Sequence, residues 1–104
     1  MRKGEVWWAR LKPPVGRRPV VLLSRDEAYA VRTAVTVAPV TRTVRGIPVE
    51  VPLGKENGLP LPCAVNCDSI LTIPKAYLES RIVVLSEKKI EDIDRAIRFA
   101  LDLP

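Results

Sequence analysis

The chain has 104 residues, 47% of them hydrophobic and 28% charged, a composition typical of one globular domain and not of a disordered chain. The formal net charge of +5 favours an anionic partner, and the absence of histidine removes the commonest general acid–base and the commonest metal ligand. No apolar stretch approaches the roughly 20 residues of a membrane helix, and no leader precedes the first strand-like segment, so we expect a cytoplasmic protein without membrane contact.

Strand-like segments follow one another along most of the chain, separated by turns rich in proline and glycine. The first of them combines aromatic and β-branched side chains, and the second is a continuous apolar run typical of a strand buried on both faces. Pro39, inside the third, indicates a bulge or a sheet edge. The sequence predicts strands at residues 4–11, 18–24, 33–41, 47–53, 63–73 (as one or two) and 81–86, turns or loops at 12–16 and 54–62, an irregular segment at 25–32, and a turn or single helical turn at 74–80.

The C-terminal segment, from residue 86 onward, has a helical period. Its apolar side chains recur every three or four residues, at Ile90, Ile93, Ile97, Ala100 and Leu101. Ser86 is placed to cap the N-terminus of this amphipathic helix. We therefore expect a mainly β protein, an SH3-like small barrel of about five or six strands that close on themselves, with a C-terminal helix, as one domain over residues 1–104.

The only cysteines, Cys63 and Cys67, are spaced C-x-x-x-C. A structural zinc site needs four ligands, and this chain offers neither histidine nor a second cysteine pair. We expect two small buried side chains, no metal and no cofactor.

Candidate binding residues gather where the second and third strands begin and end. Arg18 precedes Pro19, so its backbone is extended and its planar guanidinium fork suits bidentate contact with a phosphate. The stretch that closes the third strand sets two hydroxyls beside two arginines. Solvated turn charges remain the alternative for each cluster alone, but neighbouring strands would bring both clusters to one rim. The candidates are Arg17, Arg18, Thr41, Arg42, Thr43 and Arg45.

Trp7 and Trp8 are adjacent and therefore lie on opposite faces of the first strand. One of the two is expected to pack in the core. The other, Trp8, is a candidate surface on which an RNA base stacks, and packing or dimer contact is the alternative.

Four segments in order, "GEVWWARL", "RRPVVLLS", "VAPVTRTVRGIPVEVPL" and "AVNCDSILTI", resemble the MazF/PemK family of toxin endoribonucleases. The Gly-Glu-Val-Trp opening, the Arg-Pro before an apolar strand and the Pro-x-Thr that closes the third strand are jointly specific. The resemblance covers nearly the whole chain. One departure is the loop between the first two strands, which is shortened here to "KPPVG".

The resemblance implies a homodimeric toxin of a type II toxin–antitoxin system that cleaves single-stranded RNA without a metal ion. The ribose 2'-hydroxyl would attack, leaving a 2',3'-cyclic phosphate and a 5'-hydroxyl. The key arginine and threonine of the family correspond to Arg18 and Thr41. Arg17, Arg42 and Arg45 would contact flanking phosphates, with Thr43 and Trp8 also binding RNA. An acidic, MazE-like antitoxin would be the partner.

Two alternatives from other classes stay open on the sequence. A CcdB-like toxin shares the barrel but binds DNA gyrase and does no chemistry; it relies on an apolar C-terminal end. A plain nucleic-acid-binding barrel would need only the basic charge. The presence of Arg18 and Thr41 favours the nuclease.

Overall fold

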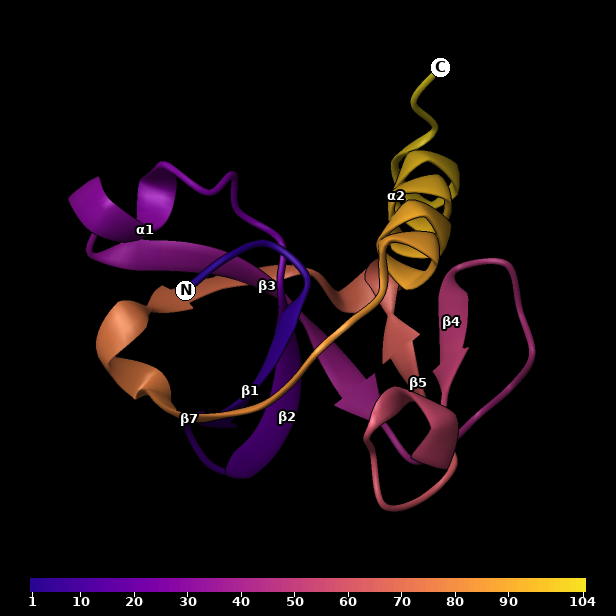
Figure 1. Ribbon diagram of the computed structural model, residues 1–104, viewed down its shortest axis with the longest axis horizontal. Coiled ribbons are helices and arrows are strands. Elements are labelled where there is room, and N and C mark those ends of the chain that lie inside the picture. Colours follow the sequence, from indigo (N-terminus) through magenta and orange to yellow (C-terminus); the bar gives the residue numbers. More distant parts are fainter.

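The computed structural model describes residues 1–104. Seven strands, two α-helices and three short 3-10 turns succeed one another along the chain (Figure 1). The strands are β1 (Glu5–Arg10), β2 (Arg17–Leu22), β3 (Ala34–Thr41), β4 (Glu50–Leu53), β5 (Cys63–Asn66), β6 (Leu71–Pro74) and β7 (Leu78–Val84); the helices are α1 (Ala28–Val31) and α2 (Glu87–Leu101); the 3-10 turns are Lys55–Asn57, Cys67–Ser69 and Lys75–Tyr77.

The strands form one antiparallel sheet in the order β4-β5-β3-β2-β1-β7, with β6 pairing β3 off this path. The expected mainly β, barrel-like fold with a C-terminal helix is confirmed. Two details differ: there are seven strands, and the sheet is not closed, because β4 and β7 each have a single partner.

Pro39 lies in the central strand β3, and the expectation of a sheet edge is wrong. On the side away from β2, β3 pairs with β6 over Ala34–Val37 and with β5 over Val40–Thr41. On that side Pro39 falls between the two paired stretches. Its nitrogen carries no hydrogen, so a proline at this position breaks no hydrogen bond between strands.

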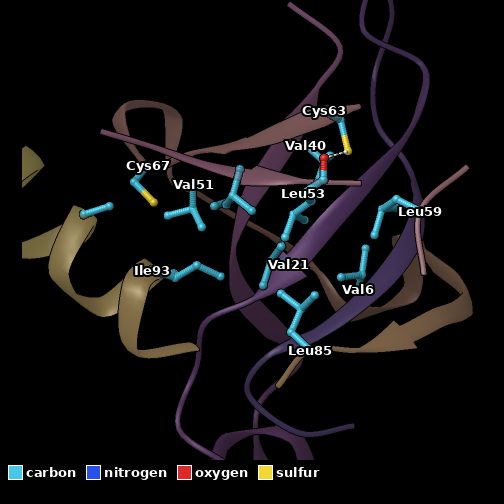
Figure 2. Packing of buried hydrophobic residues seen from close by; sticks show 13 residues of the cluster. Val6, Val21, Val40, Val51, Leu53, Leu59, Cys63, Cys67, Leu85 and Ile93 are labelled. Carbon is cyan, nitrogen blue, oxygen red and sulfur yellow. Dashed lines mark hydrogen bonds between the residues drawn. The ribbon is translucent and has the colours of Figure 1, made fainter. Parts of the chain in front are cut away.

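The sheet separates two buried clusters, and β2 contributes to both. Val21 packs in the larger cluster, while Val20 and Leu22 pack in the smaller one. All three side chains are fully buried, which confirms the prediction of a strand covered on both faces. In the larger cluster Ile93 of α2 lies next to Val51 of β4 (Figure 2). At about 25 cal/mol per Å² of apolar surface, these two clusters supply most of the driving force for folding.

Helix α2 begins where the sequence predicted. The Ser86 Oγ accepts a hydrogen bond from the Lys89 N–H at 3.2 Å, which is the expected N-cap. The helix packs against β4 and the 3-10 turn Cys67–Ser69, at the other end of the molecule from α1 (Figure 1). No helix combines the length and the apolar character that crossing a membrane requires.

Two segments have more regular structure than expected. Residues 28–31, placed in an irregular stretch, form α1, because Ala28 and Tyr29 are buried against the sheet. The helical turn expected within residues 74–80 is found at Lys75–Tyr77, but β7 already begins at Leu78. Strand β7 starts earlier than expected because residues from Leu78 onward pair with β1. The local sequence does not indicate this pairing.

Candidate active site

A hollow of about 400 Å³ opens where β2 begins and β3 ends. Antiparallel pairing of these strands, with Val20 opposite Pro39, brings Arg18 and Thr41 to one end of the sheet. Six of the seven predicted site residues line the hollow, namely Trp8, Arg17, Arg18, Thr41, Arg42 and Thr43. The expectation that the two arginine-rich clusters share a rim is therefore consistent with the structure.

Arg18 and Thr41 line this hollow from two neighbouring strands. Arg18 is half-buried at the mouth of β2 and forms no ion pair with any carboxylate. The Thr41 Oγ1 accepts a hydrogen bond from the Thr43 N–H at 3.1 Å, so its own hydroxyl proton remains available to donate. One strand end thus offers a free guanidinium and the other an oriented hydroxyl donor.

The charge of the hollow is of one sign. Its lining includes Arg17, Arg18 and Arg42 and no aspartate or glutamate. Clefts lined by one sign of charge concentrate field lines and attract counter-charged ligands. An anion such as a phosphodiester is the ligand that this lining favours.

Arg17 and Trp8 form a stacked pair at the edge of the hollow. The Arg17 Cζ lies 4.0 Å from the centroid of the Trp8 ring, a cation–π contact. Trp7, on the opposite face of β1, packs against the smaller buried cluster, and its Nε1–H donates to Glu5 at 2.8 Å. The two tryptophans lie on opposite faces as expected, but both are only partly buried, and Trp7 packs against the smaller cluster without entering it. Arg17 contacts the ring of Trp8.

Arg45 is the one predicted site residue outside the hollow. Its Nε lies 3.1 Å from the Glu50 Oε2, and Glu50 also accepts the backbone N–H groups of Arg45 and Gly46. These bonds hold the pKa of Glu50 below its usual range, the Arg45 backbone hydrogen bond being the largest cause. Arg45 thus fixes the loop that follows Thr43 to the start of β4.

Sequence reasoning missed the apolar wall of the hollow. This wall is formed by Leu59, Pro60 and Leu61, which follow the 3-10 turn Lys55–Asn57, and by Ile82 of β7. Leu59 is buried in the larger cluster, whereas Leu61 is exposed (Figure 2 shows Leu59 at one end of that cluster). The loop composition indicated only a turn, because its position against β7 depends on contacts distant in sequence.

Cys63 also lines the hollow, but neither cysteine is oxidised or exposed. Burial raises the pKa of the Cys63 thiol above its usual value and that of Cys67 to about 11. The thiolate is the nucleophilic form, so both remain inert near neutrality. Buried packing positions, as predicted, describe both residues. No group of three or more histidine, cysteine, aspartate or glutamate side chains is arranged to hold a metal ion.

A small β fold with a basic cleft free of carboxylates, lined by a half-buried arginine and a threonine, has the features of a nucleic-acid-binding protein that acts on phosphodiesters. Residues 2–101 match the family model described as PemK-like, MazF-like toxin of type II toxin-antitoxin system. The chain belongs to this toxin family, and the resemblance found in its sequence is confirmed.

Relatives and solved structures agree with this assignment. The probable endoribonuclease MazF5 of Mycobacterium tuberculosis strain H37Rv is 40% identical over 101 residues, covering 96% of this chain and 92% of the relative. The structure of the Mycobacterium tuberculosis toxin MazF-mt6 has a TM-score of 0.89 at 39% identity, covering 96% and 98% of the two chains. An endoribonuclease in complex with its cognate antitoxin, from a mycobacterial species, has a TM-score of 0.87 at 26% identity, with coverages of 100% and 97%. The protein is a toxin endoribonuclease, and the gyrase-binding alternative is not favoured.

Proposed function

We propose that the hollow between β2 and β3 is the active site, in which Arg18 and Thr41 act on a phosphodiester of single-stranded RNA. The observation that carries this assignment is the presence, in one basic hollow, of a guanidinium without a carboxylate partner and a hydroxyl with a free proton. Arg42, beside them and also without an ion pair, would bind an adjacent phosphate.

In the reaction, the ribose 2'-oxygen forms a bond to phosphorus while the bond from phosphorus to the 5'-oxygen breaks. The products are a 2',3'-cyclic phosphate and a 5'-hydroxyl. Negative charge grows on the non-bridging oxygens in the transition state, and the Arg18 fork stabilises it there more than in the substrate. The lining residues include no histidine, carboxylate or lysine, so the 2'-hydroxyl proton leaves to water or to a phosphate oxygen, and the 5'-oxygen takes up a proton from the same sources.

Thr41 acts as a donor in this scheme. Because its oxygen already accepts the Thr43 N–H, the hydroxyl proton points to a second acceptor, and a non-bridging phosphate oxygen is the one the hollow would contain. This bond would hold the phosphorus in line with the attacking oxygen. The lining offers neither carboxylate nor imidazole ligands for a metal ion.

The same basic hollow suits an acidic antitoxin. One solved relative is described as an endoribonuclease in complex with its cognate antitoxin. We propose that a MazE-like antitoxin of this chain places acidic side chains over Arg18 and Arg42, where they compete with RNA. We also propose that the protein is a cytoplasmic homodimer. Light scattering of the purified protein should then give twice the chain mass of 11.6 kDa, and a monomer would overturn the proposed dimer.

The test is incubation of the purified protein with a long unstructured RNA in the presence of EDTA, followed by primer extension. Discrete cuts that vanish in Arg18→Ala support the proposal and give the recognised motif. Loss of all cuts in EDTA with recovery on adding Mg²⁺ would overturn metal-independent cleavage. No cuts under either condition would overturn the proposed chemistry of this site.

A further inference from the structure

Strand β7 carries two irregularities, and both lie beside the active site. Ser80 pairs with Trp8 and Leu78 with Ala9, so Glu79 falls between two successive pairs and has no partner on β1. The second shift, between the Val6–Val83 and Trp7–Arg81 pairs, leaves Ile82 without a partner, and Ile82 lines the hollow. Such bulges are frequent next to active sites, where they redirect a side chain.

The redirected Glu79 side chain joins two arginines. Arg10 of β1 and Arg17 of β2 are direct partners in the sheet, an arrangement of like charges that is unfavourable alone. The Glu79 Oε1 lies 2.8 Å from the Arg17 Nε, and the Oε2 lies 3.0 Å from the Arg10 Nε. The Arg17 hydrogen bond is the largest cause that holds the pKa of Glu79 below its usual range. One carboxylate therefore offsets the repulsion between the two arginines and fixes the orientation of Arg17.

Fixed in this way, Arg17 differs from its neighbour Arg18. Its Nε is occupied by Glu79, and its guanidinium lies over Trp8 with Cζ 4.0 Å from the ring centroid. Arg17 nevertheless lines the hollow. The indole contacts the guanidinium, and 48% of the Arg17 side chain still remains exposed to solvent, so a planar ligand in the hollow can reach it.

We propose that Glu79 is a positioning residue that holds Arg17 against Trp8, and that this Trp8–Arg17 pair is a stacking platform for a nucleobase beside the cleaved bond. Guanidinium planes and aromatic rings are the surfaces on which single-stranded RNA bases stack. The inference rests on the proposed active site and gives its two adjacent arginines different ligands, since Arg18 binds the phosphate and Arg17 the base.

The test uses RNA oligonucleotides with one mapped cut site and an abasic nucleotide on either side of the cleaved bond. In the wild type, removing the stacked base should raise KM at least about fivefold, the lower end of what one stacked base contributes. In Glu79→Ala and Arg17→Lys, KM for the intact RNA should rise, kcat should change less, and the abasic penalty should disappear. Glu79→Gln keeps one acceptor oxygen and should recover part of the penalty.

Asp92→Asn is the matched control. Asp92 also contacts two cations, Lys88 and Arg95, but it lies on α2, outside the hollow. This variant loses the same charge and should keep the wild-type KM and abasic penalty. Circular dichroism and thermal unfolding of every variant separate positioning from simple loss of stability.

An abasic penalty in Glu79→Ala and Arg17→Lys equal to that of the control would overturn the inference, as would a wild type with no penalty on either side of the bond. In both cases, cleavage by the wild type and its loss in Arg18→Ala would leave the proposed function standing. A wild type that does not cut RNA would overturn the proposed function itself.

Discussion

Replacing Arg18 with alanine is expected to abolish cleavage without unfolding the protein. Two charge-assisted hydrogen bonds from a guanidinium fork to one phosphate, at about 1.5–3 kcal/mol each, sum to about 3–6 kcal/mol. Concentrated in the transition state, this loss lowers kcat/KM by about 10²- to 10⁴-fold. Arg18 has no ion-pair partner, so truncation leaves no buried carboxylate behind, and the free energy of unfolding should change by at most about 0.5 kcal/mol.

The assay is steady-state cleavage of a fluorogenic RNA oligonucleotide with one mapped cut site, with urea unfolding of each variant alongside. Arg18→Lys keeps the charge but loses the planar fork, so it should fall between wild type and alanine. Arg42→Ala should weaken binding and reduce the salt slope by about 0.7 while leaving kcat nearly unchanged. An alanine variant at Arg18 that cleaves within about tenfold of wild type would refute the reasoning, because one tenfold factor equals only about 1.4 kcal/mol.

Three further changes test other parts of the structure. Thr41→Val should lower kcat by about 10- to 100-fold in the same cleavage assay, because one hydrogen bond to a charged oxygen is lost. Thr41→Ser keeps the hydroxyl and should restore most of the activity. Equal activity of wild type and both variants would remove Thr41 from the mechanism. The pKa of Glu50 is lowered from the ordinary 4.5, so its carboxylate stabilises the fold above pH 4.5, and this stability is lost as the pH falls through the lowered folded-state pKa. Urea unfolding should show Glu50→Gln less stable than wild type at pH 7, with the difference shrinking as the pH is lowered below 4.5. A difference that grows on acidification would contradict this sign. Gly58 has φ +89°, and a Cβ added there by Gly58→Ala would lie 2.7 Å from the Val83 Cγ2. This variant should therefore be less stable by about 1–3 kcal/mol, and KM should rise because the apolar wall of the hollow is displaced. Unchanged thermal unfolding would show that the loop relaxes freely.

The sequence was sufficient for features that depend on local pattern. The apolar run before Ser24 predicted a strand buried on both faces, because a half-exposed strand would alternate. The 3.6-residue period from Ile90 onward predicted α2 and its cap at Ser86. Arg18 and Thr41, the proposed catalytic residues, were singled out because each stands at the end of a recognisable strand in a motif of the family.

Features that depend on pairing between distant segments were not predictable. Nothing near Leu59 indicates that its loop forms a wall of the hollow, since Gly58 and Val83 meet only after folding. The shift of register that releases Glu79 exists only in the pairing of β7 with β1, and the composition of neither strand indicates it. The Arg45–Glu50 pair is close in sequence, but an arginine five residues before a glutamate is too common a spacing to predict an ion pair.

Division of the arginines into fixed and free charges follows from these pairings. Arg17 and Arg18 are adjacent, and strand geometry sends them to opposite faces, where only Arg17 reaches a carboxylate. Arg45 is likewise neutralised by Glu50. Arg18 and Arg42 keep their full charge in a hollow without acidic lining residues, so a phosphodiester entering it meets two cations that need not first release a protein carboxylate. The ion-paired arginines are held in fixed orientations, and the unpaired ones are free to bind phosphate, a difference that sequence composition alone does not reveal.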